Sequence, residues 1–175
     1  MGGWAIWITG LPGSGKSTVA DAVARRLRRE HTRTQLLSVD MVRKVLTPTP
    51  TYSEEERTMV YRALVLVAQL LTQHNTNVII DATANRRRYR DWARKRIRRF
   101  GEVYLKCPLR VCMKRERARK ERFGAPSRIY LKGRTGASKT VPGVGVAYEK
   151  PLSPEVTLDT SRLDADECAD RVVRF

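Results

Sequence analysis

The sequence predicts an α/β fold, in which helices cover both faces of a parallel β-sheet. Short apolar runs rich in β-branched residues alternate along the chain with longer segments of helical periodicity, a pattern typical of βαβ units. The 175 residues fit one domain, 1–175, and no internal repeat or linker divides them. An apolar fraction of 41% is enough to build one buried core without disulfides or structural metals.

The elements can be placed in order along the chain. Strands are expected at Trp4–Thr9, Gln35–Val39, Asn77–Asp81, Glu102–Lys106 and Val156–Asp159. Helices are expected at Lys16–Arg29, Met41–Leu46, Ser53–Gln73, Arg87–Arg99, Leu109–Glu121 and Asp164–Val173. The long third helix opens on a capping-box pattern, from Ser53 to Glu56. Its buried face is predicted to consist of Met59, Leu64, Val67, Leu70 and Leu71.

One segment interrupts this alternation. Residues 122–151 contain Gly, Pro, Lys, Arg and Ser with little periodicity. A loop of this length inside a compact domain is usually either disordered or functional. We expect it to be a lid that orders over bound ligands.

The composition restricts the partners and the compartment. The net charge of +17 favours an anionic ligand without saying which one. Three cysteines, Cys107, Cys112 and Cys168, form neither a paired framework nor a zinc pattern, so a reducing cytoplasm is expected. The first residues, 1–4, lack the basic start and long apolar stretch of a signal peptide, and no run approaches the ~20 apolar residues of a membrane span, so neither feature is expected.

A phosphate-binding loop follows the first expected strand and precedes a helix. It matches G-x-x-x-x-G-K-[ST] in full, and the residues predicted to bind ATP here are Gly10, Leu11, Pro12, Gly13, Ser14, Gly15, Lys16, Ser17 and Thr18. Glycines let successive N–H groups turn toward the β-phosphate, Lys16 reaches the β- and γ-phosphates, and Ser17 offers a hydroxyl to Mg²⁺. The strand–loop–helix context argues against an incidental glycine-rich turn. The fold is therefore predicted to be of the P-loop NTPase type.

Two carboxylates end neighbouring strands at the edge where this loop lies. Asp40 follows the second strand and Asp81 ends the third. Either could orient Mg²⁺ or accept a proton from an attacking hydroxyl, and the sequence does not rank them; Asp40 could alternatively only cap a helix. Arg43 lies one turn after Asp40, where it can face an anion. A short chain without the guanine-reading N-K-x-D tetrapeptide favours a small-molecule kinase.

Several motifs, in the right order, resemble those of adenylylsulfate kinases. After the P-loop, Leu37–Leu46 is similar to L-D-G-D-x-x-R-x-x-L, and Tyr52–Arg57 to F-S-x-E-x-R. Pro108–Arg115 is similar to P-L-x-V-C-x-x-R. The closing F-T-G-x-x-x-x-Y-E-x-P…L-D-T pattern of the family is similar to Val141-Pro142-Gly143, Tyr148–Pro151 and Leu158-Asp159-Thr160.

This resemblance implies transfer of the ATP γ-phosphate to the ribose 3′-hydroxyl of adenylylsulfate, and a homodimer. It implies that Asp40 is the catalytic carboxylate and, with Ser17, a Mg²⁺ partner. Arg43 and Arg57 would hold the phosphosulfate, Tyr52 would pack on its adenine, Lys139 would reach it from the lid, and Arg115 would lie over the adenine of ATP. The chain departs from the family pattern at Val60 (usually Asn), Ala84 (usually Ser) and Val141 (usually Phe).

Two other functions fit parts of the sequence. The three departures, with the Asp81-Ala82-Thr83 element, favour a P-loop kinase of another small hydroxyl compound or nucleoside. The charge favours a nucleic-acid-binding protein, but aromatic residues make up only 7% of the chain and are not interleaved with arginine as stacking platforms would be. The sequence therefore disfavours nucleic acid as a partner.

Overall fold

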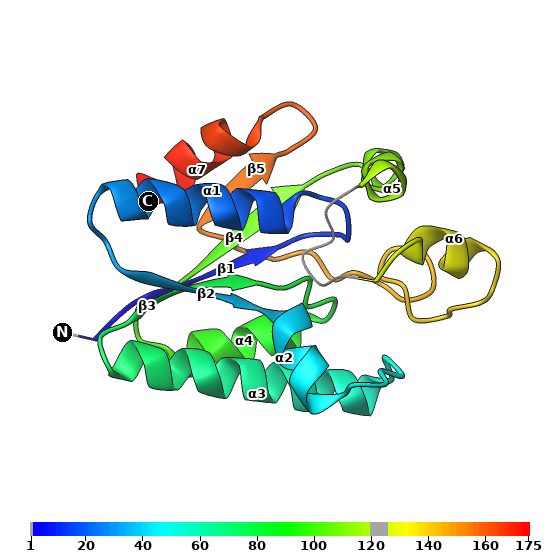
Figure 1. Ribbon diagram of the computed structural model, residues 1–175, viewed down its shortest axis with the longest axis horizontal. Coiled ribbons are helices and arrows are strands. Elements are labelled where there is room, and N and C mark those ends of the chain that lie inside the picture. The colour runs from blue at the N-terminus through cyan, green and yellow to red at the C-terminus, as the bar shows by residue number, and fades with distance from the viewer. Residues whose placement is uncertain (1, 120–125) are drawn as a thin grey trace.

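The computed structural model describes residues 2–119 and 126–175, arranged around one parallel five-stranded sheet in the order β2-β3-β1-β4-β5. The strands are β1 (Ala5–Thr9), β2 (Thr34–Ser38), β3 (Asn77–Asp81), β4 (Phe100–Lys106) and β5 (Val156–Asp159). The helices are α1 (Lys16–Arg29), α2 (Val39–Leu46), α3 (Glu54–Gln73), α4 (Arg87–Arg96), α5 (Leu109–Ala118), α6 (Ile129–Arg134) and α7 (Ala165–Val173). Helices α1 and α7 lie on one face of the sheet and α3 and α4 on the other (Figure 1). The predicted fold class is confirmed.

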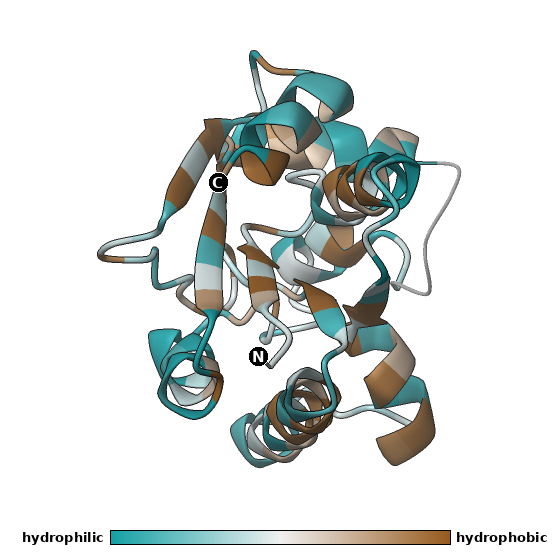
Figure 2. Cartoon of the chain, turned by 90° about the vertical axis from the view of Figure 1, so that its left-hand side faces the viewer, coloured by the Kyte–Doolittle hydropathy of each residue, from teal (hydrophilic) through white to brown (hydrophobic). Residues whose placement is uncertain are grey.

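The sheet has two separate cores because successive residues of a strand point to opposite faces. Trp7 and Ile80 pack with Leu64 of α3 on one face. Ile8 and Ile79 pack with α1 and α7 on the other. Figure 2 shows apolar residues along the strands and along the helices beside them. Both faces are therefore covered, which is why the strands are nearly continuous in apolar residues.

The register brings the carboxyl ends of three strands together. β1 lies between β3 and β4, with Ile8 opposite Asp81, and Ser38 of β2 is also opposite Asp81. From β1 the chain crosses to β2 and β3 on one side, and later to β4 and β5 on the other. In open α/β sheets such a reversal creates the ligand crevice at the strand ends. The loop after β1 is placed in that crevice.

Most element boundaries predicted from the sequence agree with the structure. The strands Asn77–Asp81 and Val156–Asp159 and the helix Lys16–Arg29 have the predicted bounds. Helix α4 was predicted to reach Arg99 but ends at Arg96, because Ile97 adopts extended backbone and the chain enters β4 at Phe100. The fifth helix was predicted to reach Glu121 but ends at Ala118, because Arg119 adopts extended backbone; residues 120 and 121 lie outside the described residues.

Helix α3 has the predicted buried face, but three of the five residues assigned to it were wrong, while Leu64 is buried and Leu71 packs against the core. Met59, Val67 and Leu70 are 47%, 39% and 48% exposed, and of the predicted set Leu64 alone is fully buried. Helix α3 instead turns inward the residues Glu56, Arg57, Val60, Tyr61, Leu64, Val65, Ala68 and Thr72. The two inward charges have partners: Glu56 pairs with Arg43 of α2 and with the segment before α3, and Arg57 donates to Asn85 after β3. The capping box is half formed: Ser53 accepts from the Glu56 amide, but the Glu56 carboxylate turns to other groups.

The described part of the predicted lid packs against the phosphate-binding loop. Tyr130 of α6, a helix not predicted from the sequence, donates its hydroxyl to Pro12 O at 2.7 Å. Tyr130 also shares a small apolar cluster with Val141, Cys107 and Cys112. Residues 122–125 of the predicted segment lie outside the described residues. Among the described helices, none is long and apolar enough to cross a membrane.

Candidate active site

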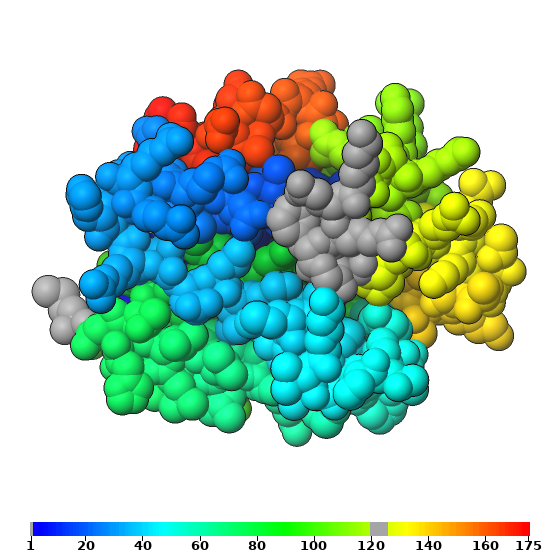
Figure 3. Space-filling model, viewed as in Figure 1, coloured from blue at the N-terminus to red at the C-terminus, as the bar shows by residue number. Residues whose placement is uncertain are grey.

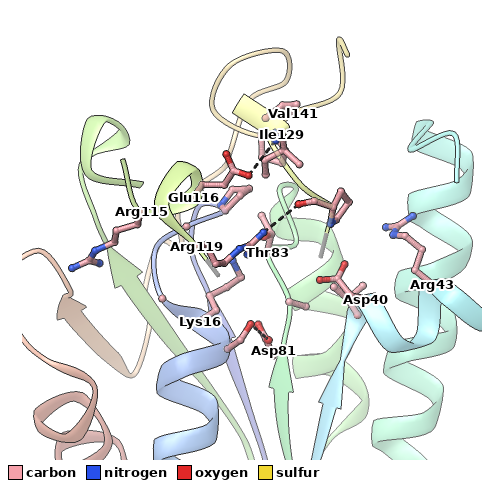
Figure 4. Close-up of a pocket in the computed structure, with 18 of the residues that line it drawn as sticks. Lys16, Asp40, Arg43, Asp81, Thr83, Arg115, Glu116, Arg119, Ile129 and Val141 are labelled. Atoms are coloured by element: carbon pink, nitrogen blue, oxygen red, sulfur yellow. Dashed lines mark hydrogen bonds between the residues drawn. The ribbon is translucent and has the colours of Figure 1, made fainter. Parts of the chain in front are cut away.

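A cavity of about 960 Å³ opens at the carboxyl ends of the strands. Its wall combines the loop after β1, the starts of α1 and α2, the ends of β3 and α5, and the segment 138–142. Figure 3 shows α5 and the yellow-to-orange segment after it projecting at this end of the molecule. Figure 4 shows charged side chains from these elements pointing into the cavity.

Glycines give the phosphate-binding loop its shape. Gly13 and Gly15 have φ of 79° and 95°, in the left-handed region that other residues rarely adopt. A Cβ on Gly13 would lie 2.4 Å from the Cys112 carbonyl oxygen, so no side chain fits there. Helix α1 then starts with no side-chain cap and no acidic residue in its first turn. Its N-terminal amides are thus left to a phosphate, which such a terminus binds well.

Lys16 is partly buried and lies near two carboxylates in the cavity. Its ammonium donates to Leu11 O at 3.2 Å, so the side chain curls back over the loop. Burial lowers the pKa of Lys16, and the charges of Asp81 and Asp40 oppose that shift. The phosphates of a bound nucleotide would add negative charge at the same place and favour the charged lysine.

Ser17 and Asp81 form a direct pair: the Ser17 hydroxyl donates to Asp81 Oδ2 at 2.6 Å. A P-loop hydroxyl beside an aspartate at a strand end is a donor set that fits Mg²⁺, which takes one or two carboxylates and completes its shell with water and phosphates. No group of three or more His, Cys, Asp or Glu side chains that could hold a metal occurs in residues 2–119 and 126–175. A magnesium ion would therefore be shared with the nucleotide. The structure pairs Ser17 with Asp81, whereas the family resemblance implied Asp40 as the carboxylate that shares Mg²⁺ with Ser17.

Asp40 lies in the first turn of α2 and lines the cavity. It is not the helix cap, because Ser38 fills that position and accepts from the Asp40 amide at 3.2 Å. Burial raises the pKa of Asp40, the nearby Asp81 charge raises it further, and Lys16 and Arg43 oppose the shift. A carboxylate with a raised pKa is a better proton acceptor near neutral pH than an ordinary aspartate.

Arg43 and Tyr52 face each other beside Asp40. The Arg43 guanidinium lies 4.7 Å from the centre of the Tyr52 ring and forms a buried ion pair with Glu56. The Glu56 carboxylate also accepts from the amides of Thr51 and Tyr52, at 2.5 and 3.1 Å. These bonds hold Tyr52 at its φ of 58°, an uncommon backbone conformation for a non-glycine residue. Glu56 thus organises this wall, a role that the sequence analysis missed because a capping glutamate was expected.

Arg57 connects three segments of the site. Its nitrogens donate to Tyr52 O at 3.0 Å, to Asn85 Oδ1 at 3.3 Å and to Thr140 O at 2.6 Å. Tyr52 precedes α3, Asn85 follows β3, and Thr140 belongs to the predicted lid. Three of the five N–H donors of Arg57 are therefore engaged by the protein. A direct contact with substrate, implied by the resemblance, stays a prediction.

Two further predicted residues differ in where they lie. Arg115 lines the cavity and donates to Thr160 O at 2.6 Å, so its guanidinium is fixed at the end of β5. Lys139 is exposed and does not line the cavity, although Ser138 and Thr140 on either side of it do. The structure brings Arg115 to the site and leaves Lys139 outside it.

The three positions that depart from the family pattern are apolar and buried. Val60 and Ala84 are fully buried, and Val141 is 6% exposed and lines the cavity. The Ala84 amide donates to the hydroxyl of buried Tyr61 at 2.8 Å, which fixes the turn after β3 at a φ of 43° for Ala84.

Comparison with known proteins decides the family. A family model described as adenylylsulphate kinase matches residues 2–159. The chain belongs to the adenylylsulphate kinase family. A probable adenylyl-sulfate kinase of Pyrococcus abyssi is 37% identical over 174 residues, which cover 99% of this chain and 95% of that protein.

Solved structures of relatives agree with this assignment. The APS kinase of Mycobacterium tuberculosis in complex with AMPPNP and APS is 31% identical, with a TM-score of 0.87 over 99% of this chain and 96% of that one. A hexameric APS kinase from Thiobacillus denitrificans is 25% identical, with a TM-score of 0.68 over 99% of this chain and 28% of that one. Like these relatives, the chain is a kinase with a nucleotide-binding P-loop fold.

Proposed function

We propose that this protein transfers the γ-phosphoryl group of Mg²⁺-bound ATP to the 3′-hydroxyl of adenylylsulfate, giving ADP and 3′-phosphoadenylylsulfate, a step of sulfate assimilation. One observation carries the proposal: Asp40 stands in a single cavity between the P-loop on one side and the Arg43–Tyr52 wall on the other. The first side suits a triphosphate. The second offers a cation and an aromatic ring to an anionic nucleotide.

In the proposed step, the acceptor oxygen forms a bond to the γ-phosphorus as the bond to the β–γ bridging oxygen breaks. The electron pair of the broken bond leaves on ADP, and the acceptor proton passes to the Asp40 carboxylate. Lys16 and the α1 amides hold the β- and γ-phosphates. Ser17 with Asp81 or Asp40 would hold Mg²⁺, which would supply positive charge to the phosphates. Such reactions depend mainly on positioning and electrostatics.

The test is ADP release in a coupled assay with adenylylsulfate as the sole acceptor, followed by identification of the product. Simple sugars, polyols and nucleosides in parallel reactions test the second candidate, a kinase of another hydroxyl compound. That candidate is favoured by the buried apolar Val60 and Ala84 and by Val141 at the cavity wall. ADP release with one of these acceptors but not with adenylylsulfate would refute the proposed substrate and retain the reaction class.

We also propose that the protein is a cytoplasmic homodimer formed through α2 and α3. Beyond the cavity these helices expose apolar side chains: Met41, Val45, Leu46, Met59, Leu66, Val67 and Leu70. Several large exposed apolar side chains on two neighbouring helices are typical of an interface. Light scattering after size exclusion should give twice the mass of one chain. The double variant Leu66→Arg, Leu70→Arg should give the mass of one chain. A monomeric unmodified protein would refute the dimer.

A further inference from the structure

Arg119 lies at the end of α5, and the roles described above leave it without a function. It lines the cavity with Lys16 and Asp40, and its guanidinium donates to Pro126 O at 3.2 Å. Figure 4 shows this guanidinium close to the end of the Lys16 side chain, above the P-loop. The charge of Arg119 contributes to lowering the pKa of both Lys16 and Asp40, which places it near the two groups. It therefore lies where the two substrates would meet.

Three other arginines of the cavity, Arg43, Arg57 and Arg115, are tied to groups of the protein, and Arg25 faces Asp166 of α7 at 4.0 Å. Arg43 pairs with Glu56, Arg57 bridges three segments, and Arg115 is fixed on Thr160. Arg119 forms no ion pair with any acidic side chain of the described residues. Its hydrogen bond to Pro126 uses one of five N–H donors. A partly buried guanidinium with donors to spare, inside an anion-binding cavity, is suited to bind a phosphoryl group.

The chemistry of the transfer needs such a group. Charge spreads over the γ-phosphoryl oxygens and the β–γ bridging oxygen as the old bond breaks and the new one forms. Lys16 lies on the P-loop side of these atoms, and Asp40 accepts the proton of the acceptor hydroxyl in the proposed step. A donor that stays protonated can neutralise the developing charge without entering the proton transfer, and arginine is such a donor.

We propose that Arg119 is a catalytic residue that donates hydrogen bonds to the γ-phosphoryl oxygens during their passage from ATP to the acceptor hydroxyl. Arg119 gives up no proton and forms no covalent bond in this step. The inference rests on the proposed function only for ATP-dependent phosphoryl transfer, not for the identity of the acceptor.

The full chain, with Mg²⁺, ATP and adenylylsulfate, provides the first test. Arg119→Ala should lower kcat by about 10²–10³-fold, the range for loss of one transition-state donor, and change the KM values less than about threefold. The kcat of Arg119→Lys should lie between those of the wild type and Arg119→Ala, because lysine keeps the charge without the planar donors. Arg117→Ala is the matched control, since Arg117 lies on the same helix, is exposed and does not line the cavity. A fall in kcat below about tenfold, or one that Arg117→Ala shares, would overturn the proposal.

A second measurement does not depend on the acceptor. Binding of ADP to the wild-type chain should tighten when aluminium fluoride is added, because the fluoride complex imitates the transferring phosphoryl group. In Arg119→Ala, the tightening of ADP binding by aluminium fluoride should be at least about tenfold smaller than in the wild type. The variant should still bind ADP alone normally, which also shows that it is folded. Retention of the full gain, or an equal loss of affinity for ADP alone, would count against a catalytic Arg119. If adenylylsulfate gives no product with the wild-type chain, the proposed substrate fails, and this comparison still decides the role of Arg119.

Discussion

Asp81→Asn should separate the metal role from the base role at this site. The structure gives Asp81 a charge-assisted hydrogen bond of 2.6 Å from the Ser17 hydroxyl, at the position where Mg²⁺ would bridge to the nucleotide. Asp40 has no such contact with Ser17 and has a raised pKa, as expected of a proton acceptor. The substitution keeps the shape of the side chain and removes its charge, so the change reports the carboxylate itself.

The size of the effect follows from the interaction that is lost. An interaction with a charged group of this kind contributes roughly 1.5–3 kcal/mol, which corresponds to about a 10- to 150-fold change in an equilibrium constant. We therefore expect the Mg²⁺ concentration for half-maximal activity to rise by that factor in Asp81→Asn. Asp40→Asn should lower kcat by at least ~10²-fold and change the Mg²⁺ dependence little, because a general base acts on the acceptor proton.

The assay is turnover at saturating ATP, measured over a Mg²⁺ titration for wild type and both variants. Binding of ADP without Mg²⁺ is the control, and it should be similar in all three proteins if the P-loop is intact. If Asp40→Asn raises the Mg²⁺ requirement more than Asp81→Asn does, Asp40 is the metal partner and the assignment is reversed. A requirement within about threefold of wild type in Asp81→Asn would also refute the reasoning.

Two further predictions concern stability. Burial and the charge of Asp81 raise the pKa of Asp40 in the native state above its ordinary value of 3.8, so ionising this carboxyl costs the native state free energy. The native state therefore loses stability as pH rises from 3.8 through the folded-state pKa. Asp40→Asn should thus melt at a higher temperature than wild type near pH 7. The difference in melting temperature should shrink on acidification and vanish below pH 3.8, and a difference that stays constant with pH would contradict this. Gly13→Ala should weaken ADP binding at least ~tenfold and lower the melting temperature, because its Cβ meets the Cys112 carbonyl at 2.4 Å. Gly136→Ala, at a similar φ of 77° with nothing within 4 Å, controls for backbone strain, and equal effects of the two would rule out the clash.

The features set by local patterns were predictable from the sequence. Apolar β-branched runs gave the strands, since a strand covered on both faces has few places for polar residues. The P-loop was predictable because its glycines are required by positive φ and close backbone approach, as at Gly13. Asp40 and Asp81 were predicted to lie near each other because parallel strands end at one edge, and the cavity contains both.

Features set by tertiary partners were not predictable in this way. The orientation of α3 depends on where Glu56 finds donors and Arg57 finds acceptors, and hydrophobic periodicity carries no such information. The pairing of Ser17 with Asp81, rather than with Asp40, depends on the register of β1 and β3. Lys139 has the right charge for an anionic substrate, but the chain turns its side chain outside the cavity lining.

The arginines of this site illustrate why charge alone predicts so little. Arg43, Arg57, Arg115 and Arg119 all line the cavity. Arg43 and Arg57 are buried and held by groups of the protein, and the exposed Arg115 donates to Thr160 O, so the positive charge of all three is already directed at fixed acceptors. Removing any of these three would disturb the walls of the cavity as well as its field. Arg119 differs because its guanidinium lies close to the end of the Lys16 side chain and donates to Pro126 O alone among the described residues, so a substitution there changes the field where the substrates would meet with little change in the walls. Of the four arginines, Arg119 should consequently be the one whose substitution lowers kcat with the least change in the affinity for ADP.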